Sequence, residues 1–299
     1  MWLLLAFLSA TLLGFYDVFK KKSLKDNAVL PVLFLNTLFS SLIFLPFILL
    51  SAFVPGVLEG TMFDVPVVGW EVNKFIIIKT FIVLSSWILG YFGMKHLPIT
   101  IVGPINATRP VMVLVGAMLV FGERLNLYQW IGVLLAVVSF FMLSRSGKKE
   151  GIDFKHNKWI LFIVLAAVAG AVSGLYDKYL MKQLPPMVVQ SWYNVYQVFI
   201  MCPILALLWW PKRKSSTPFR WDWAIIFISI FLCAADFVYF YALSYEDSMI
   251  SIVSMVRRGS VIVSFLFGAM MFREKNLKSK AIDLILVLIG MIFLYLGTK

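Results

Sequence analysis

The chain has 299 residues, of which 61% are hydrophobic and only 14% are charged, and its formal net charge is +12. Soluble domains are about one-quarter charged, so this composition excludes an ordinary soluble protein and indicates an integral membrane protein. The apolar residues form long continuous runs, which favours membrane-spanning helices over the alternating pattern of a transmembrane barrel. We therefore expect an all-α fold.

The positive charge does not indicate a nucleic-acid partner, because the cations stand in short loops beside apolar runs, where they meet anionic lipid headgroups. Cys202 and Cys233 lie inside apolar runs and predict buried thiols without a disulfide framework. No G-x-x-x-x-G-K-[ST] and no H-E-x-x-H sequence occurs. The sequence thus predicts no cofactor and no metal, and any transport would be secondary or passive. An intramembrane enzyme is the weaker alternative.

Apolar runs bounded by charges, prolines or glycines predict ten spans. The first lacks a preceding basic region and a clean cleavage site, which favours a retained helix over a signal peptide. In chain order the spans are 2–19, 29–52, 75–94, 98–121, 127–144, 159–180, 187–210, 223–243, 248–272 and 280–297.

Five spans fall in each half of the chain. Residues 1–145 form the first repeat, 146–158 a polar linker and 159–299 the second repeat. An odd number of spans in each copy places the copies in opposite orientations, the inverted-repeat plan of many secondary transporters.

Short sequence echoes support two related halves. Gly14-Phe15-Tyr16-Asp17 in span one is matched by Gly174-Leu175-Tyr176-Asp177 in span six. Gly116-Ala117-Met118 with Glu123 is matched in span nine by Gly268-Ala269-Met270 with Glu274. Small residues at helical spacing predict close helix packing inside the bundle, with dimerisation as the alternative, so a monomer and a homodimer both remain open. These stripes are Gly170-x-x-x-Gly174, Gly132-x-x-x-Ala136 and Gly90-x-x-Gly93.

Loop charges predict the orientation. Of the 27 lysines and arginines, Lys79, Arg109, Arg257 and Arg258 lie within spans, and the loop cations on one side are Lys74, Arg124, Lys178, Lys182 and Lys299. The remaining eighteen fall on the other side, which the positive-inside rule makes cytoplasmic. We therefore expect both termini outside the cytoplasm.

Arg257 and Arg258 stand near the middle of span nine, and Arg109 stands near the middle of span four. Counted from Met249, Arg257 lies about 12 Å into a hydrocarbon core about 30 Å thick. A charge at that depth costs about 2.5 kcal/mol or more, and such groups face a protein interior or a watery cavity. The arginines therefore indicate a solute pathway.

Spans four and nine close in Phe121-Gly122-Glu123 and Phe272-Arg273-Glu274, and Pro110 stands in span four. With ten spans in two five-helix copies, these motifs resemble the drug/metabolite transporter superfamily, in its EamA branch, over essentially the whole chain. Arg273 departs from the family's usual glycine, and the charge bias opposes the family's termini-inside arrangement. The resemblance implies a basket-like bundle in which spans one to four and six to nine line a central cavity.

Polar side chains within these spans are the candidates for the site, and Lys79 and Gln197 belong to this wider inventory. The residues selected for substrate binding are Asn36, Trp87, Asn106, Arg109, Tyr193, Asn194, Tyr239, Arg257 and Arg258. Asp236, Asp17 and Asp177 are the candidates for proton coupling.

Each aspartate also has a structural interpretation. Asp17 and Asp177 can pair with lysines at the ends of their own helices. Asp236 has no charged neighbour in its helix, so we expect it to face the arginines of span nine, either in a structural ion pair or in a cavity where a solute competes for the charges.

This inventory predicts a secondary active transporter, with export as the direction more common in the family. Arginine for a carboxylate, aspartate for an amine and aromatic walls suit small polar or zwitterionic, amino-acid-like metabolites. The excess of buried cations favours the alternative of a phosphorylated or lipid-linked solute, and efflux of drug-like compounds is a further alternative. The expected location is the cytoplasmic membrane of a bacterium, where the partners are the solute and the lipids.

Overall fold

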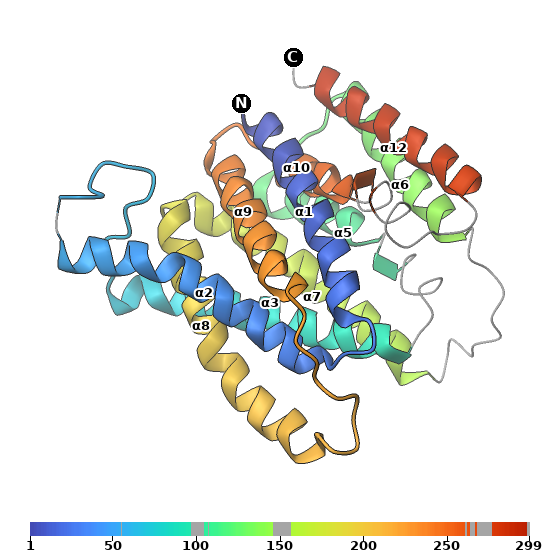
Figure 1. Ribbon diagram of the computed structural model, residues 1–299. Coiled ribbons are helices and arrows are strands. Elements are labelled where there is room, and N and C mark those ends of the chain that lie inside the picture. The colour runs from blue at the N-terminus through green and yellow to red at the C-terminus, as the bar shows by residue number, and fades with distance from the viewer. Residues whose placement is uncertain are drawn as a thin grey trace. The chain divides into compact units, whose positions relative to one another are not determined.

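The computed structural model of the protein describes residues 1–54, 56–96, 105–106, 108–145, 157–260, 262–263, 267 and 277–297. Over these residues the regular secondary structure is helical throughout, so the expected all-α class is confirmed (Figure 1). The linker from 146 to 156, the first residues of span four and the motif Phe272-Arg273-Glu274 lie outside the described residues.

Outside spans four and nine each predicted apolar run corresponds to a helical stretch, although α1 extends five residues past its run and α3 begins five residues before its run. The helices are α1 (Trp2–Leu24), α2 (Val29–Phe53), α3 (Trp70–His96), α5 (Arg109–Phe121), α6 (Leu127–Arg145), α7 (Lys158–Met181), α8 (Pro186–Ile204), η1 (Leu205–Trp209), η2 (Trp210–Lys212), α9 (Ala224–Ser244), α10 (Ile250–Arg258) and α12 (Leu277–Leu296).

Six helical stretches in the described part of the chain are long and apolar enough to cross a membrane. They are α1, α2, Trp70–Gly93 of α3, α7, Pro186–Lys212 and α9. Helix α5 is apolar but has only 13 residues. The protein is therefore a helical integral membrane protein.

The chain forms two compact units. Unit 1 contains Met1, Ile82–Lys178 and Asp247–Lys299, and unit 2 contains Trp2–Phe81 and Tyr179–Glu246. Helices α3 and α7 contribute to both units. Each unit combines helices from both halves of the sequence, so long-range packing joins the two sequence halves within each unit.

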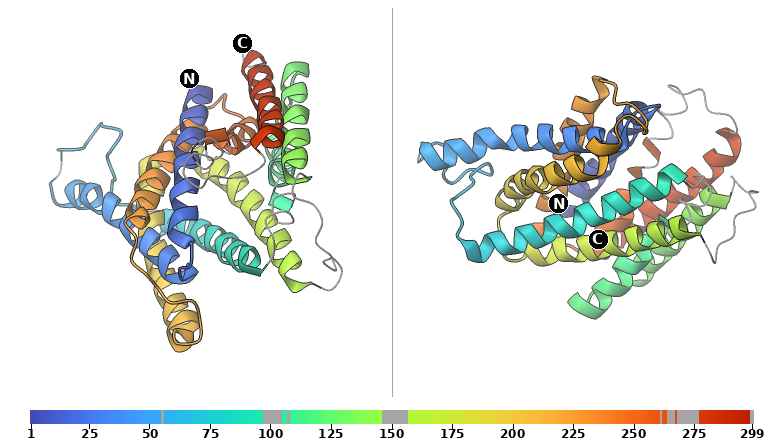
Figure 2. Two further views of the ribbon diagram at one scale, coloured as in Figure 1. Left: turned by 45° about the vertical axis from the view of Figure 1, so that its right-hand side comes forward. Right: turned by 90° about the horizontal axis from the view of Figure 1, so that it is seen from below.

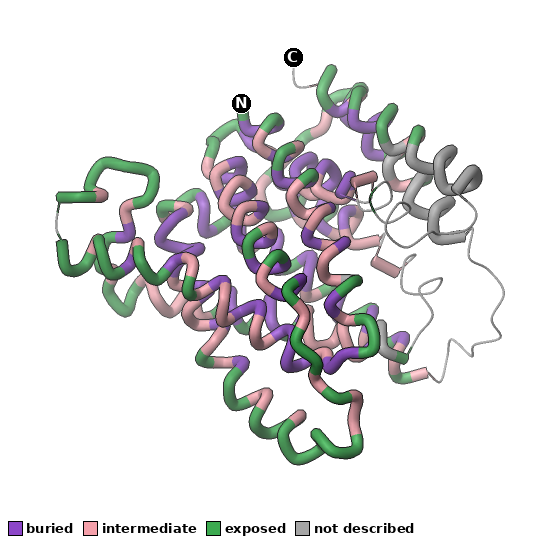
Figure 3. The backbone as a smooth tube through the Cα atoms, in the orientation of Figure 1, coloured by how far each residue is buried: buried purple, intermediate pink, exposed green. Residues whose placement is uncertain are grey.

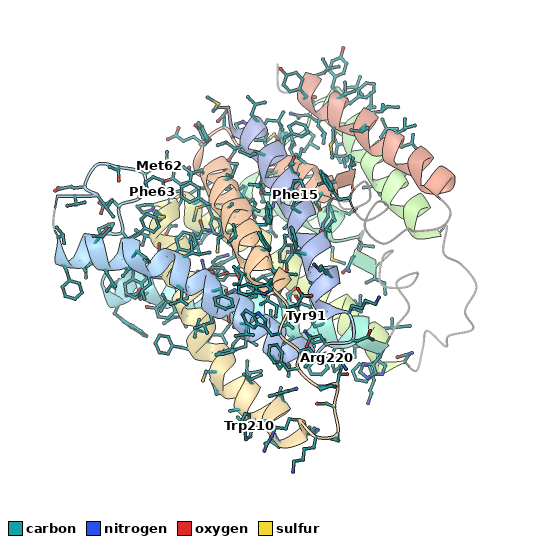
Figure 4. The ribbon with its side chains drawn as sticks, viewed as in Figure 1. Phe15, Met62, Phe63, Tyr91, Trp210 and Arg220 are labelled. Atoms are coloured by element: carbon teal, nitrogen blue, oxygen red, sulfur yellow. The ribbon has the colours of Figure 1, made fainter. Side chains whose placement is uncertain are left out.

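In unit 2, α1 packs along α9, and α2 packs against α8 and α9. Phe15 of α1, labelled in Figure 4, stacks on Phe231 of α9 with 5.3 Å between ring centroids. The hydroxyl of Ser9 donates a 2.7 Å hydrogen bond to the carbonyl of Ala235 on α9. Aromatic stacking and one buried polar contact therefore fix α1 on α9.

The loop between α2 and α3 is largely exposed (Figure 3), yet it is anchored in unit 2. Phe63 stacks on Phe47 of α2 and on Phe237 of α9. The hydroxyl of Tyr241 donates to the carbonyl of Met62 at 2.7 Å. The loop thus bridges the ends of two helices.

In unit 1, α6 lies along α12 and α5 contacts α10, and Figure 2 shows α6 and α12 side by side. A Cβ atom on Gly132 of α6 would lie 2.7 Å from the carbonyl oxygen of Gly290 on α12. Ser86 of α3 donates a 2.8 Å hydrogen bond to the carbonyl of Ala166 on α7.

The predicted glycine stripes pack inside the chain. A Cβ on Gly93 would lie 2.4 Å from Ile163, and one on Gly90 would contact Ala166 at 3.7 Å. Gly170 and Gly174 of α7 similarly face residues of α5. The internal packing expected for these small residues is confirmed, because each glycine has a neighbouring helix of the same chain against it.

Candidate functional site

The structure divides the predicted site residues between the two units. Unit 1 holds Trp87, Asn106, Arg109, Asp177, Arg257 and Arg258. Unit 2 holds Asp17, Asn36, Tyr193, Asn194, Asp236 and Tyr239. Within unit 1 the helix that starts with Arg109 contacts the helix that ends with Arg257 and Arg258. The expected contact between Asp236 and these arginines stays a prediction.

Arg109 is the first residue of α5 and reaches across to α7. Its Nη2 atom donates a 2.7 Å hydrogen bond to the carbonyl of Gly170. A Cβ atom on Gly170 would lie 2.5 Å from Cζ of Arg109, so glycine is needed for the guanidinium to lie this close to the helix backbone. Trp87 and Asn106 are both half-buried in the same unit.

Span nine is interrupted directly after its two arginines. Helix α10 ends at Arg258, and Gly259 forms a turn in which its N–H donates to the carbonyl of Val256 at 2.9 Å. Further helical residues occur at Ser260, Ile262, Val263 and Phe267. A turn at Gly259 therefore separates α10 from the helical residues beyond it, within the predicted span 248–272.

Span four shows a related interruption beside its arginine. Residues 105–106 are helical, Thr108 lies in a turn, and α5 begins only at Arg109 with Pro110 behind it. Proline has no N–H to donate, which suits it to the first turn of a helix and not to the interior of a long one. The arginines of both spans therefore stand at helix ends and not at the centres of continuous helices.

Glu123 joins these two arginine-bearing helices at their other ends. Gly122 adopts the left-handed conformation with φ of 66° and terminates α5. The carboxylate of Glu123 then accepts hydrogen bonds from the N–H groups of Ile250 and Ser251, at 2.7 and 3.2 Å, and from the Ser251 hydroxyl. In the F-G-E motif, the glycine thus ends α5 and the glutamate caps the start of α10.

Asp177 and Lys178 are buried together near the end of α7. The Nζ atom of Lys178 donates a 2.6 Å hydrogen bond to the hydroxyl of Ser248, just before α10. Lys178 is only 2% exposed, so the loop-facing position expected for this cation is wrong. The start of α10 is therefore held by Glu123, which follows α5, and by Lys178 of α7.

In unit 2, polar side chains gather along one face of α8. Gln190, Tyr193, Asn194 and Gln197 recur at helical spacing and are all buried. The Nδ2 atom of Asn194 donates back to the carbonyl of Gln190 at 2.8 Å. The ammonium of Lys79, from α3, lies 4.4 Å from the ring centroid of Tyr193.

The remaining candidates of unit 2 lie on α1, α2 and α9. Asn36 accepts hydrogen bonds from the hydroxyl of Ser229 through both its side-chain and its backbone oxygen, at 3.1 and 3.2 Å. Its side chain therefore joins α2 to α9. Tyr239 is buried on α9, whereas Asp236 on α9 and Asp17 on α1 are half-buried.

Lys79, Gln190 and Gln197 were not selected for substrate binding from the sequence. Glu123 was identified only as part of a motif. The periodic polar stripe of α8 was a signal that could have pointed to the glutamines. The capping role of Glu123 left no local signal, since its partners Ile250 and Ser251 are more than a hundred residues away.

Charged and polar side chains lie inside apolar helices, and three of them, Arg109, Arg257 and Arg258, stand beside helix breaks. These features define a polytopic helical membrane protein that holds polar groups away from water. The model of the EamA-like transporter family matches residues 1–145 and 157–296. The chain therefore belongs to the EamA-like transporter family, within the drug/metabolite transporter superfamily, and is a membrane transporter.

Two further similarities agree with this family. An uncharacterized transporter of Archaeoglobus fulgidus is 24% identical over 276 residues, which cover 91% of this chain and 90% of that protein. The crystal structure of a protein that is 16% identical superposes with a TM-score of 0.72, over 99% of this chain and 95% of its own. The second similarity concerns the fold alone.

Proposed function

We propose that this protein is a secondary active transporter that exports small polar or zwitterionic, amino-acid-like metabolites across the cytoplasmic membrane. The observation that carries the proposal is the pair of contacting helices α5 and α10, which bring Arg109, Arg257 and Arg258 into one unit of a membrane protein. Guanidinium groups in such surroundings are suited to a carboxylate, which they can bind through paired hydrogen bonds.

The interruptions beside these arginines support a solute pathway. Irregular backbone at membrane depth is tolerated where it is buried in protein or lines a cavity, and interrupted helices recur at the binding sites of secondary transporters. The turn at Gly259 and the start of α5 at Arg109 are such places.

The proposal includes ten spans in two inverted five-helix repeats. Exchanging the repeats would pair α1 with α7, α2 with α8, α3 with α9 and α6 with α12. The observed contacts α2–α8 and α6–α12 map onto themselves in this exchange, and α1–α9 maps onto the α3–α7 contact made at Ser86 and Ala166. This agreement supports the repeat without depending on sequence similarity between the copies.

A phosphorylated or lipid-linked solute is the second candidate. It is favoured by the number of cations within the spans, which includes Lys79 beside the three arginines. The amino-acid-like class accounts better for the acidic partners of an amine, since Asp17, Asp177 and Asp236 also lie within helices of the bundle.

The distribution of loop cations, eighteen against four once the buried Lys178 is left out, supports termini outside the cytoplasm in this proposal. The uptake test uses proteoliposomes of the purified protein with an imposed proton gradient and a panel of radiolabelled amino acids, drug-like cations and phosphorylated metabolites. Accumulation of amino-acid-like solutes above protein-free vesicles supports the proposal. Accumulation confined to phosphorylated or drug-like solutes would refute the amino-acid-like class and support the corresponding alternative.

A further inference from the structure

The polar face of α8 is unusual for a membrane helix. Gln190, Tyr193, Asn194 and Gln197 occupy positions i, i+3, i+4 and i+7 and therefore share one face. All four are buried within unit 2. Polar residues in membrane helices are rare and serve packing or function, so each polar atom on this face needs a partner or a purpose.

Two side-chain atoms on this face lack a partner. The Nε2 atom of Gln190 donates to the carbonyl of Cys233 at 2.8 Å, but its Oε1 atom has no hydrogen-bond partner among the described residues. The same holds for the Nε2 atom of Gln197 within the described part of the chain. Both glutamines are 1% exposed. Buried polar atoms are nearly always paired, so this acceptor and this donor point to a polar ligand.

Lys79 brings a positive charge to the same face of α8 through its contact with Tyr193. It is 2% exposed, and its Nζ atom lies 4.4 Å from the ring centroid of Tyr193 and 4.8 Å from that of Phe240. The ring faces stabilise and orient an ammonium group. Tyr193 stands one helical turn from either glutamine, so the ring that the ammonium contacts belongs to the same face of α8 as the two unpaired amide atoms.

We infer that Lys79, Gln190 and Gln197 form a binding site in unit 2 for the carboxylate end of an amino acid or a 2-hydroxy acid. The ammonium of Lys79 and the Nε2 group of Gln197 donate to the carboxylate oxygens. The Oε1 atom of Gln190 accepts from the amino or hydroxyl group next to that carboxylate. One ammonium together with one amide donor matches the single charge and the two oxygens of a carboxylate.

An acceptor at Gln190 also selects the class of solute. A simple fatty acid carries no donor beside its carboxylate and would leave the Oε1 atom unpaired, which lowers its affinity relative to an amino or hydroxy acid. The inference rests on the proposed function, because it names a part of the protein that contacts the transported solute.

The test is ligand-induced thermal stabilisation of the purified full chain in detergent, monitored by tryptophan fluorescence. The probes are the standard amino acids and common 2-hydroxy acids, the primary amide of each, and inorganic phosphate. The variants are Lys79→Met, Lys79→Arg and Gln197→Leu. Lys74→Met is the matched control, because Lys74 stands on the same helix α3 but is exposed and paired with Glu71.

We expect one or more acids to stabilise the wild type and the Lys74→Met control, while the corresponding amides do not. Lys79→Met and Gln197→Leu should weaken that acid at least tenfold, and Lys79→Arg should weaken it less. Gln197→Leu should be as stable as the wild type without ligand, since leucine removes an unpaired donor. This variant keeps the test valid should Lys79→Met fail to fold.

Four outcomes overturn the site: no acid stabilises the wild type, acids and amides act equally, phosphate alone stabilises, or Gln197→Leu binds the acid as tightly as the wild type. Transport separates this failure from failure of the proposed function. If Lys79→Met or Gln197→Leu transports an acid with an unchanged KM, the site is refuted, whereas the proposed transport function is supported. Binding that depends on Lys79, without uptake of that acid, refutes transport alone.

Discussion

The carboxylate of Glu123 caps the first turn of the helix that begins at Ile250. Met249, the residue before that helix, offers no side-chain acceptor, so the N–H groups of Ile250 and Ser251 depend on a carboxylate from the first half of the chain. A negative charge at a helix start is also favoured by the helix dipole. The contact therefore positions the helix that ends in Arg257 and Arg258.

Removing this cap should destabilise the protein. Glu123→Ala removes all three hydrogen bonds, and a lost helix cap costs about 1–2 kcal/mol, equivalent to a fall of about 2–8 °C in Tm. The Tm of Glu123→Gln should lie between those of the wild type and Glu123→Ala, because one carboxylate oxygen is replaced by an amide donor that faces backbone donors. Thermal unfolding in detergent measures the effect, with the exposed Glu71→Gln as control. A Tm unchanged in Glu123→Ala would contradict the capping role.

Most helix boundaries could be predicted from the sequence, because apolar runs between charges are a strong local signal. The runs at 29–52, 127–144 and 223–243 differ from α2, α6 and α9 by at most one residue at either end. The turn at Gly259 could not be predicted, since a single glycine in an apolar run is often helical. The neighbour of this turn is non-local, because Met291 of α12 packs directly against Gly259.

The sequence predicted which residues are polar candidates more successfully than it predicted their hydrogen-bond partners. Arg109 was selected as a buried cation, but its bond to the carbonyl of Gly170 depends on how α5 packs on α7. Asn36 was selected as a solute ligand, yet its side chain is engaged by Ser229. Local sequence identifies polar groups in an apolar span, whereas the tertiary fold decides which of them pair with one another.

Gly132 should not tolerate a methyl group. A Cβ atom there would lie 2.7 Å from the backbone oxygen of Gly290, so α6 and α12 would have to separate. Overpacking of this kind costs about 1–3 kcal/mol, and Gly132→Ala should lower the Tm in detergent. Gly174→Ala is the control, because its Cβ would make an ordinary 3.8 Å contact with Val113. Equal Tm values for the two variants would refute the close approach.

Cysteine labelling should reveal the orientation. In a background with Cys202→Ala and Cys233→Ala, Glu59→Cys and Lys214→Cys place single thiols in exposed loops. Five predicted spans separate the two positions, so they should lie on opposite faces of the membrane. The distribution of loop cations predicts that an impermeant maleimide labels Glu59→Cys in intact cells and reaches Lys214→Cys only after permeabilisation. The reverse pattern would place the termini in the cytoplasm.

Conservative replacement of the arginines at the end of α10 should impair transport without unfolding the protein. Lysine keeps the charge but cannot reproduce the planar, two-pronged hydrogen bonding of a guanidinium. We expect Arg257→Lys or Arg258→Lys to raise the KM for the transported solute at least about tenfold, the equivalent of about 1.4 kcal/mol. Arg213→Lys, in an exposed loop, is the control. Loss of folded protein in both variants would instead indicate a structural ion pair.

The last prediction concerns energy coupling through Asp236. This carboxyl stands in the interior of the apolar helix α9, thirteen residues along it when Ala224 is counted as the first, and carboxyl groups within membrane helices serve as proton carriers in pumps and transporters. Asparagine has the same shape but cannot release a proton. Asp236→Asn should therefore lose accumulation driven by a pH gradient and retain exchange of solute between equally buffered compartments. The two activities are measured in the same proteoliposomes, with the exposed Glu59→Gln as control. If Asp236→Asn concentrates solute as well as the wild type does, coupling depends on Asp17 or Asp177, or the protein runs without protons.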